Sequence, residues 1–368
     1  MSYIADRMNM IDASGIRKIF ALAAKMKNPI NLSIGQPDYD VDQVCKDIAV
    51  AQIQAGFNSY TQTWGIEELR EACSEYYERK FGVPLKNVMI TSGVSGGLFL
   101  ALMATLNPGD EVICADPYFV MYKHLVNLLG AVSVPVDTYP DFKLTPERVE
   151  KAITPRTKMI IVNSPANPTG VVMSKAELQA LADVAKKHNL LVISDEIYES
   201  LLYDDEPSTI VGMLDNVICL NGFSKNAAMT GWRVGFASGP DDIIQAMNTL
   251  QQYTFVCAPS FAQKAAVAAL KADMGGKVAA YRTKRDLAYE GLRDLFPVTK
   301  PGGAFYIFPQ APGGDGDEFV RRAIENSVLI IPGSVFSERK SHFRISFAAP
   351  DDTIRRGCEV LRAIAEKG

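Results

Sequence analysis

From Val88 to about Ser224 the chain repeats one unit, a short apolar strand followed by a turn and, in most repeats, a helix. The strands read VMIT, EVICA, AVSVPVD, KMIIVNS, LLVISD and NVICLNG. Runs this apolar suit strands that are buried on both faces, and their alternation with helices is typical of a mostly parallel sheet covered by helices. We therefore expect an α/β fold whose large domain is built around such a sheet.

The region after the repeats no longer alternates apolar strands with helices. A long amphipathic helical stretch ends near Leu295, and KPGGAFYIFP, VLIIPGSVF and HFRISFA then read as short strands with one helix among them. A chain of 368 residues is long for a single core, so a second, smaller α+β domain is the natural expectation.

Charge and cysteine usage exclude several classes of function. The net charge of −4 gives no basic footprint for nucleic acid or an anionic membrane, and no apolar run approaches the length of a membrane span. Six scattered cysteines without a CxxC pair argue against a zinc site or a disulfide framework. With only three histidines, none in a metal-like setting, we expect no metal and a location in the reducing cytosol.

Polar residues, aromatic residues or a glycine-rich turn follow the apolar strands at the point where each strand ends. They include Gly93 in SGVSGG, Phe119, Asn167 between two prolines, Asp195 and Lys225. In an open, mostly parallel sheet the carboxyl ends of the strands form the ligand crevice, so these residues are predicted to converge.

The chemistry of two of these segments points to a phosphorylated aldehyde. A lysine amine such as that of Lys225 can form an imine with an aldehyde, and the fork of Arg233 can hold a phosphate. The glycine-rich turn at Gly93 opens a helix, whose free N–H groups also suit a phosphate. Each signal has an ordinary alternative, since a Ser-Lys pair is usually a solvated surface feature and a glycine-rich turn is often only a turn. Their convergence favours pyridoxal 5'-phosphate (PLP).

The ordered motifs carry a family resemblance. SIGQPD, NSYTQTWGIEELREA, NSPANPTG, DEIY, FSKNAAMTGWRVG, GGAFYIFP and FRISFA together resemble the class I and II aminotransferases of PLP fold type I, and aspartate aminotransferase in particular, from about residue 10 to the end. The resemblance implies a PLP-binding large domain over residues 46–283. It also implies a small domain formed by residues 1–45 and 284–368.

The resemblance assigns catalytic roles to residues of the crevice. Lys225 matches the imine-forming lysine that later moves a proton, and Asp195 matches the partner of the protonated pyridine nitrogen. Asn167 and Tyr198 match the residues that hydrogen-bond the phenolate oxygen of the ring, and Phe119 matches the aromatic that stacks on the ring.

The resemblance also assigns a phosphate site and a substrate site. The phosphate ligands would be Gly93, Val94, Ser95, Ser224, Arg233 and, from the neighbouring subunit of a homodimer, Tyr60. The α-carboxylate of the substrate would be bound by Arg344 as a two-point pair, with help from Asn167 and the backbone of Gly35. From the residues alone, a lone arginine such as Arg344 in a strand is more often a solvated guard on an edge strand, and Gly35 could equally be a simple backbone kink.

Two positions depart from the family pattern. Many relatives have a serine where this chain has Gly222, three residues before the lysine, so one phosphate hydroxyl is missing and Ser95 would compensate. Some aspartate-specific relatives have a lysine where this chain has Ser95, which weakens the preference for acidic substrates.

We expect a transaminase that moves an amino group between an L-amino acid and a 2-oxo acid by a ping-pong route. Aspartate with 2-oxoglutarate is the first expectation, followed by aromatic and alanine-type donors. A carbon–sulfur β-lyase is the alternative, because it uses the same Lys225, Asp195 and Arg344. A regulatory module of this fold is disfavoured, since the lysine is kept and no basic DNA-binding extension is present.

Overall fold

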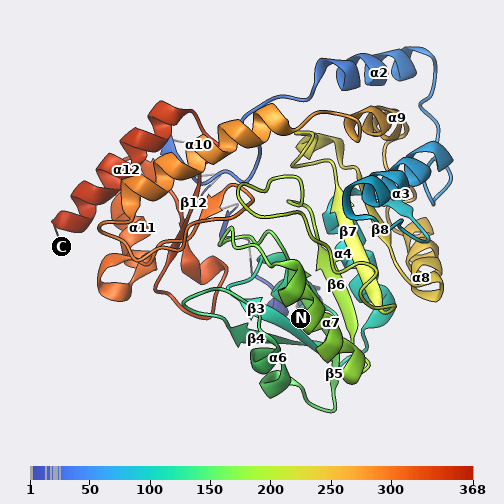
Figure 1. Ribbon diagram of the computed structural model, residues 1–368, viewed down its shortest axis with the longest axis horizontal. Helices are drawn as coiled ribbons and strands as arrows, with labels where there is room; N and C mark the ends of the chain where they lie inside the picture. The colour runs from blue at the N-terminus through green and yellow to red at the C-terminus, as the bar shows by residue number, and fades with distance from the viewer. Residues whose placement is uncertain (1–2, 13–14, 17–18, 20–23, 25, 368) are drawn as a thin grey trace.

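The protein, described by a computed structural model over residues 3–12, 15–16, 19, 24 and 26–367, is built around a seven-stranded sheet (Figure 1). In spatial order its strands are β2 (Met89–Thr91), β8 (Gly235–Ser238), β7 (Val217–Gly222), β6 (Leu191–Asp195), β5 (Thr157–Asn163), β3 (Glu111–Asp116) and β4 (Val132–Asp137). β8 is antiparallel to both neighbours, and the other neighbouring pairs are parallel. The expected mostly parallel α/β sheet is confirmed.

Helices cover both faces of this sheet. The reason is visible in β5, where Met159 and Ile161 enter the core on one face while Ile160 and Val162 enter the core on the other. The first face is covered by α4 (Gly93–Thr105), α5 (Met121–Leu128) and α8 (Asp241–Gln252). The second is covered by α3 (Glu67–Phe81), α6 (Pro146–Ala152), α7 (Lys175–Lys187) and α9 (Ser260–Ala269).

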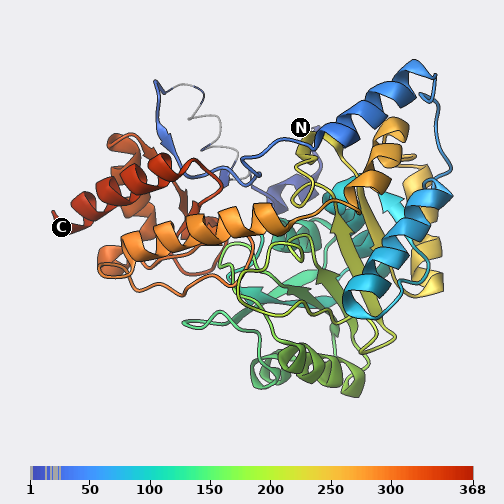
Figure 2. The same ribbon diagram turned by 45° about the horizontal axis from the view of Figure 1, so that its top comes forward.

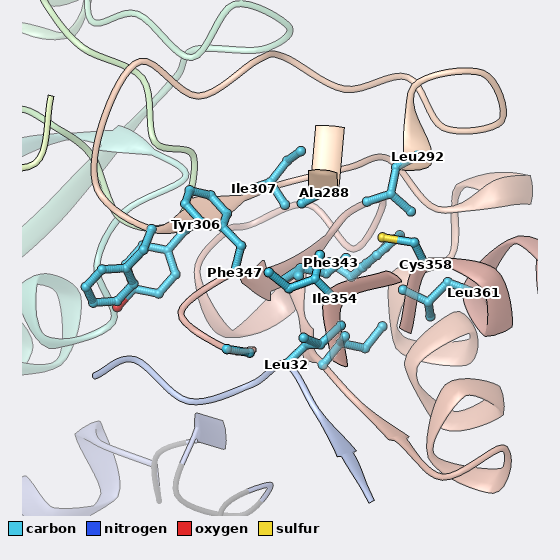
Figure 3. Close-up of a cluster of buried hydrophobic side chains, with 14 of the residues drawn as sticks. Leu32, Ala288, Leu292, Tyr306, Ile307, Phe343, Phe347, Ile354, Cys358 and Leu361 are labelled. Carbon is cyan, nitrogen blue, oxygen red and sulfur yellow. The ribbon is translucent and has the colours of Figure 1, made fainter. Parts of the chain in front are cut away.

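The C-terminal part forms a second core, which α10 (Gly275–Leu292) joins to the large sheet (Figure 2). Its other elements are β9 (Tyr306–Ile307), α11 (Gly316–Glu325), β10 (Val328–Leu329), β11 (Ile331–Pro332), β12 (Phe343–Ser346) and α12 (Asp351–Glu366). Short 3₁₀ turns lie at η1 (Asp6–Met10), η2 (Thr230–Trp232), η3 (Pro312–Gly314) and η4 (Gly333–Val335). Figure 3 shows how Phe343, Phe347, Ile354 and Leu361 pack together in this core.

The N-terminal segment contributes to both parts. β1 (Ile30–Asn31) pairs in parallel with β10, and Leu32 is fully buried in the C-terminal core. α2 (Gln43–Gln54) instead packs with the large domain, because Cys45 and Ala49 belong to the cluster beneath α3 and α9. The domain limit expected at residue 46 therefore falls inside α2, and the division into 46–283 and 1–45 with 284–368 stays a prediction.

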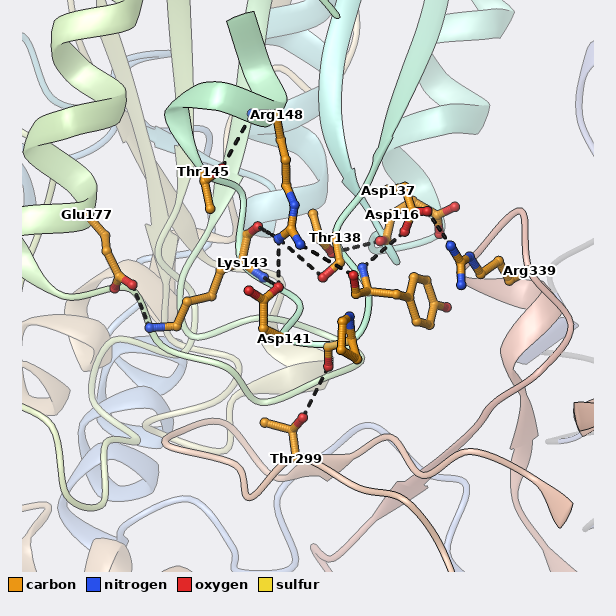
Figure 4. A network of polar contacts seen from close by, with 12 residues as sticks. Asp116, Asp137, Thr138, Asp141, Lys143, Thr145, Arg148, Glu177, Thr299 and Arg339 are labelled. Carbon is orange, nitrogen blue, oxygen red and sulfur yellow. Dashed lines mark hydrogen bonds and ion pairs between the residues drawn. The ribbon is translucent and has the colours of Figure 1, made fainter. Parts of the chain in front are cut away.

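A polar network lies where the loop after β4 meets the C-terminal part (Figure 4). Arg148 donates at 2.6 Å to the carbonyl of Lys143 and at 2.6 Å to Asp141, which ties the loop to α6. Across the boundary Arg339 pairs with Asp137. These contacts fix the C-terminal part against the carboxyl ends of β3 and β4. Among the described helices, none is both long and apolar enough to cross a membrane.

Candidate functional site

Lys225 lies in the turn that follows β7, at the carboxyl edge of the sheet. Its Nζ donates a hydrogen bond to the carbonyl oxygen of Gly35 at 2.5 Å, and it lies 5.8 Å from the centre of the Tyr198 ring. The pKa of Lys225 is lowered from 10.5 to about 8, mainly by burial and also by the charges of Arg344 and Arg233, while Asp195 opposes the shift. A lysine of this kind is partly neutral, and so nucleophilic, near physiological pH.

Asp195 ends the neighbouring strand β6 and is 4% exposed. Its Oδ2 accepts a hydrogen bond from the hydroxyl of Tyr122 at 2.6 Å, and its Oδ1 accepts one from the amide of Ile197 at 3.3 Å. Burial raises the pKa of Asp195, while Tyr122, the Ile197 amide and Lys225 oppose the rise. A buried carboxylate without a direct ion-pair partner among the described residues is costly, and it suits a cationic ligand atom.

Two asparagines link the end of β5 to its neighbours: Asn163 bonds the end of β6, and Asn167 bonds Asn163 and Arg344 of β12. Asn163 donates through Nδ2 to the carbonyl oxygen of Asp195 at 2.9 Å, and its Oδ1 accepts from the amide of Asn167 at 2.9 Å. Asn167 is 5% exposed, and its Oδ1 accepts from Nη1 of Arg344 at 3.0 Å. The backbone N–H of Asn167 is therefore held by Asn163, and its side-chain carboxamide is held by Arg344.

Arg344 on β12 is 1% exposed, so it is not the solvated edge arginine that its alternation with apolar neighbours would also have allowed. Its Nη2 donates to the carbonyl oxygen of Ser33 at 3.0 Å. The guanidinium lies 4.4 Å from the ring centre of Tyr306 and 4.6 Å from that of Phe336. A guanidinium has five donors, and two of them are used by Ser33 and Asn167, while Nε has no partner among the described residues. The remaining donors can hold a carboxylate.

Tyr198 and Tyr306 join the lysine side of the crevice to the arginine side. Their hydroxyl oxygens are 3.0 Å apart, and both residues are buried. Gly35 lies against this pair, since a Cβ at Gly35 would be 2.7 Å from the hydroxyl of Tyr306. The close approach, rather than a positive φ, is what requires glycine here.

A second cationic region lies at the start of α4. Gly93 has φ +66°, and a Cβ there would be 2.8 Å from Nη2 of Arg233. Gly93, Val94 and Ser95 begin the helix, so their N–H groups lack helical acceptors and the helix dipole adds positive potential. Arg233 is exposed, and its Nη1 donates to the carbonyl oxygen of Thr230 at 3.1 Å. Free N–H groups beside a guanidinium fit a phosphate.

The structure gives a physical reason for glycine at position 222. A Cβ at Gly222 would lie 2.8 Å from Cα of Gly235, and a Cβ at Gly235 would lie 2.7 Å from the carbonyl carbon of Gly93. The last residue of β7 thus packs against the first residue of β8, and that residue packs against the first residue of α4, backbone against backbone. A serine at position 222 would clash there. Ser224 stands half-buried directly before Lys225.

The structure brings most predicted site residues together, but not Tyr60. That side chain is 83% exposed and makes no hydrogen bond or ring contact with the described residues of this chain. Phe119 is half-buried, with its ring centre 5.7 Å from that of Tyr122. β3, β5, β6 and β7 pair in parallel one after another, so their carboxyl ends lie at the same end of the sheet. Sequence reasoning missed Tyr122, Asn163 and Tyr306; only Tyr122, one helical turn after Phe119, carried a usable signal.

Comparisons with known proteins agree on one family. The family model described as aminotransferase class I and II matches residues 27–361. A probable aspartate aminotransferase of Methanocaldococcus jannaschii is 38% identical, with 99% of this chain and 100% of that protein covered. Aromatic-amino-acid aminotransferase 2 of Thermococcus litoralis is 35% identical over 99% of this chain and 98% of its own length. The solved aspartate aminotransferase of Thermus thermophilus with maleate has a TM-score of 0.95 at 35% identity, covering 99% of this chain and 100% of that one.

Proposed function

Because this chain belongs to the class I and II aminotransferases and is a transaminase, we propose that it binds PLP around Lys225. There it moves an amino group between an L-amino acid and a 2-oxo acid in two half-reactions. The observation that carries the proposal is the half-buried amine of Lys225, with a pKa of about 8, placed among Asp195, Arg344 and Arg233.

The residues of the crevice fit PLP group by group. The carboxylate of Asp195 would hold the protonated pyridine nitrogen, which matches its burial without a direct cationic partner. Asn167 and Tyr198 would hydrogen-bond the ring oxygen, and Phe119 would lie on the ring face. Arg233, Ser224 and the first amides of α4, at Gly93, Val94 and Ser95, would hold the phosphate. When bound, PLP supplies an aldehyde that bonds an amine and a ring that takes up electron density from the substrate's α-carbon.

Lys225 performs the proton transfer in this proposal. Its Nζ is held by the carbonyl oxygen of Gly35 at 2.5 Å, and its lowered pKa keeps a fraction of the amine neutral near pH 8. A neutral amine can take the proton from the α-carbon of the amino acid, and a general base works best when its pKa lies near the operating pH.

The substrate would be oriented by its α-carboxylate. Arg344 is fixed by Ser33 and Asn167 and has donors left over, so it can form a two-point pair with a carboxylate without reorganising. The backbone of Gly35 borders the same space. A substrate held in this way would present its α-carbon to the side of the crevice where Lys225 lies.

The amino donor is proposed from the relatives. Their names include aspartate, aromatic amino acids, aspartate with prephenate, and N-acetyl-LL-diaminopimelate. We propose aspartate with 2-oxoglutarate first, with aromatic and alanine-type donors as the alternatives. Ser95, where some aspartate-specific relatives carry a lysine, is the feature that favours the alternatives.

We also propose that the active unit is a homodimer in which Tyr60 of one subunit completes the phosphate site of the other. The side chains of Tyr60 and Tyr253 are 83% and 85% exposed, which is unusual for large aromatic side chains. The segments that carry them are joined by the hydrogen bond from Gln251 Nε2 to the carbonyl oxygen of Thr63 at 2.7 Å, so a second copy of the chain packed there would cover these side chains.

Single-turnover spectroscopy tests the proposal. The purified protein loaded with PLP is mixed separately with L-aspartate, L-phenylalanine and L-alanine, and the absorbance of the cofactor is followed. An absorbance change that a 2-oxo acid reverses supports amino transfer, and the fastest donor identifies the substrate. Lys225→Ala should abolish the change, and normal turnover in that variant would refute the assignment. Release of pyruvate and ammonia from cystathionine would instead support the β-lyase.

A further inference from the structure

The hydroxyl of Tyr77 is the centre of a buried polar network behind the crevice. Tyr77 lies on α3, is fully buried, and donates a hydrogen bond to Oε2 of Glu196 at 2.9 Å. The same hydroxyl oxygen accepts from Nδ2 of Asn221 at 2.9 Å and from the thiol of Cys219 at 3.3 Å. A hydroxyl has one donor and two acceptor sites, so these three bonds use its whole capacity.

Asn221 connects this hydroxyl to the strand end that leads to Lys225. Its side-chain oxygen accepts from the amide of Gly222 at 2.7 Å, and Gly222 is the last residue of β7. Gly222 also pairs and packs with Gly235 of β8, so the Asn221 side chain adds a second contact that holds this strand end. The turn that carries Lys225 starts from there.

Glu196 connects the same hydroxyl to the strand end that carries Asp195. Its Oε1 accepts from the hydroxyls of Ser194 at 2.7 Å and Thr209 at 2.6 Å. Glu196 has no lysine or arginine partner among the described residues, and Glu199, whose charge acts on it, has its side chain outside the Tyr77 hydrogen bonds and paired with Lys80. Burial raises the pKa of Glu196 to about 7 and Glu199 adds to the rise, while the three hydroxyl donors oppose it.

The two strand ends are neighbours, so one hydroxyl reaches both. β6 and β7 pair in parallel with Asp195 opposite Leu220, and the amide of Glu196 donates to the carbonyl oxygen of Leu220 at 2.9 Å. Neither Tyr77 nor Glu196 faces the crevice, since both lie on the α3 side of the sheet.

We propose that Tyr77 and Glu196 are positioning residues for amino transfer. Through Asn221 they hold the end of β7 from which Lys225 turns into the crevice, and through the backbone of Glu196 they hold Asp195. The inference rests on the proposed roles of Lys225 and Asp195.

Tyr77→Phe tests the proposal, because it removes only the hydroxyl. Tyr76→Phe is the matched control, since the Tyr76 hydroxyl is on the same helix but bonds Glu199 at 2.8 Å and Ser200 at 3.1 Å. With PLP bound and saturating amino donor, Tyr77→Phe should lower the single-turnover rate constant about tenfold, because it breaks the hydrogen-bonded link between Glu196 and Asn221. The KM for the donor should stay within about twofold because Arg344 is untouched, and Tyr76→Phe should match the wild type.

A second measurement uses the cofactor-free protein. The rate at which an amine-reactive reagent labels Lys225 is measured against pH by peptide mass spectrometry, and the wild-type midpoint should lie at a pKa of about 8. In Tyr77→Phe the freed turn lets water reach the amine, so the midpoint should rise by at least about half a unit. Tyr76→Phe should keep the wild-type midpoint.

The proposal is overturned if Tyr77→Phe has the wild-type rate constant and the wild-type labelling midpoint, even with a lower melting temperature. If that variant does not fold, Glu196→Gln carries the test. Glutamine has one acceptor oxygen where the carboxylate has two, so it cannot accept from Tyr77 on one side and from Ser194 and Thr209 on the other, and the rate and midpoint should change in the same directions. A wild-type protein without transaminase activity would refute the proposed function, whereas the labelling midpoints would still decide whether the network positions Lys225.

Discussion

Replacing Arg344 by lysine tests how the substrate is oriented. The arginine is 1% exposed and is held at 3.0 Å by Asn167 Oδ1 and at 3.0 Å by the carbonyl oxygen of Ser33. Its other donors are proposed to bind the α-carboxylate of the substrate. Lysine keeps the positive charge but replaces a planar fork by a single point charge, so a two-point pair is no longer possible.

The expected loss follows from the hydrogen bonds. A bond to a charged group contributes roughly 1.5–3 kcal/mol, and Arg344→Lys removes at least one of the two bonds to the carboxylate. This free energy corresponds to a fall of roughly 10- to 150-fold in kcat/KM for the amino donor. The affinity for PLP should change little, because Arg344 is not among the residues proposed to hold the cofactor.

Steady-state kinetics with the best donor, together with a PLP titration, provide the assay. Arg339→Lys is the matched control, since Arg339 is about half exposed and pairs with Asp137 at the surface. It should retain kcat/KM within about twofold. A kcat/KM for Arg344→Lys within threefold of the wild type would refute the role given to this residue.

Three further predictions concern protonation and assembly. In the cofactor-free protein, the pKa of Lys225 is lowered from 10.5 to about 8, so the unfolded chain binds more protons between these values and stability rises with pH across that window. Urea unfolding of the wild type relative to Lys225→Met should show this rise, up to ~3 kcal/mol, and parallel pH dependences would contradict it. Because the Tyr122 hydroxyl lowers the pKa of Asp195, Tyr122→Phe should move the acidic limb of the pH–rate profile to higher pH, and an unmoved limb would contradict this. If Tyr60 acts across a dimer, mixing Tyr60→Ala with Lys225→Ala subunits should restore activity through one intact site, and no recovery in mixed dimers would argue against the shared site.

The positions of Lys225, Asp195 and Asn167 at one edge of the sheet could be predicted because each follows an apolar strand. Strands such as β5 and β6 are buried on both faces, so their sequences are apolar throughout and a polar residue marks the strand end. The mostly parallel sheet then brings the marked ends together. The change in sequence pattern after Leu295 predicts a second, α+β region, and the residue limits of the two domains stay a prediction.

Contacts between distant segments could not be predicted in this way. Tyr122 donates a hydrogen bond to Asp195, which lies 73 positions later in the chain. The hydroxyls of Tyr198 and Tyr306, 108 positions apart, also contact each other. A buried tyrosine looks like any core aromatic in the sequence until its hydroxyl is seen to have a partner. Gly222 looked like a lost phosphate ligand, and the backbone packing at Gly235 explains it only in three dimensions.

The central claim is that the strand ends converge on Lys225 as the residue that carries PLP. The most direct measurement is borohydride reduction of the protein with PLP, followed by proteolysis and peptide mass spectrometry. The structure predicts that the cofactor's mass is found on the peptide that contains Lys225, and that it is absent from Lys225→Ala. Attachment at another lysine, or no stable attachment in the wild type, would contradict the claim.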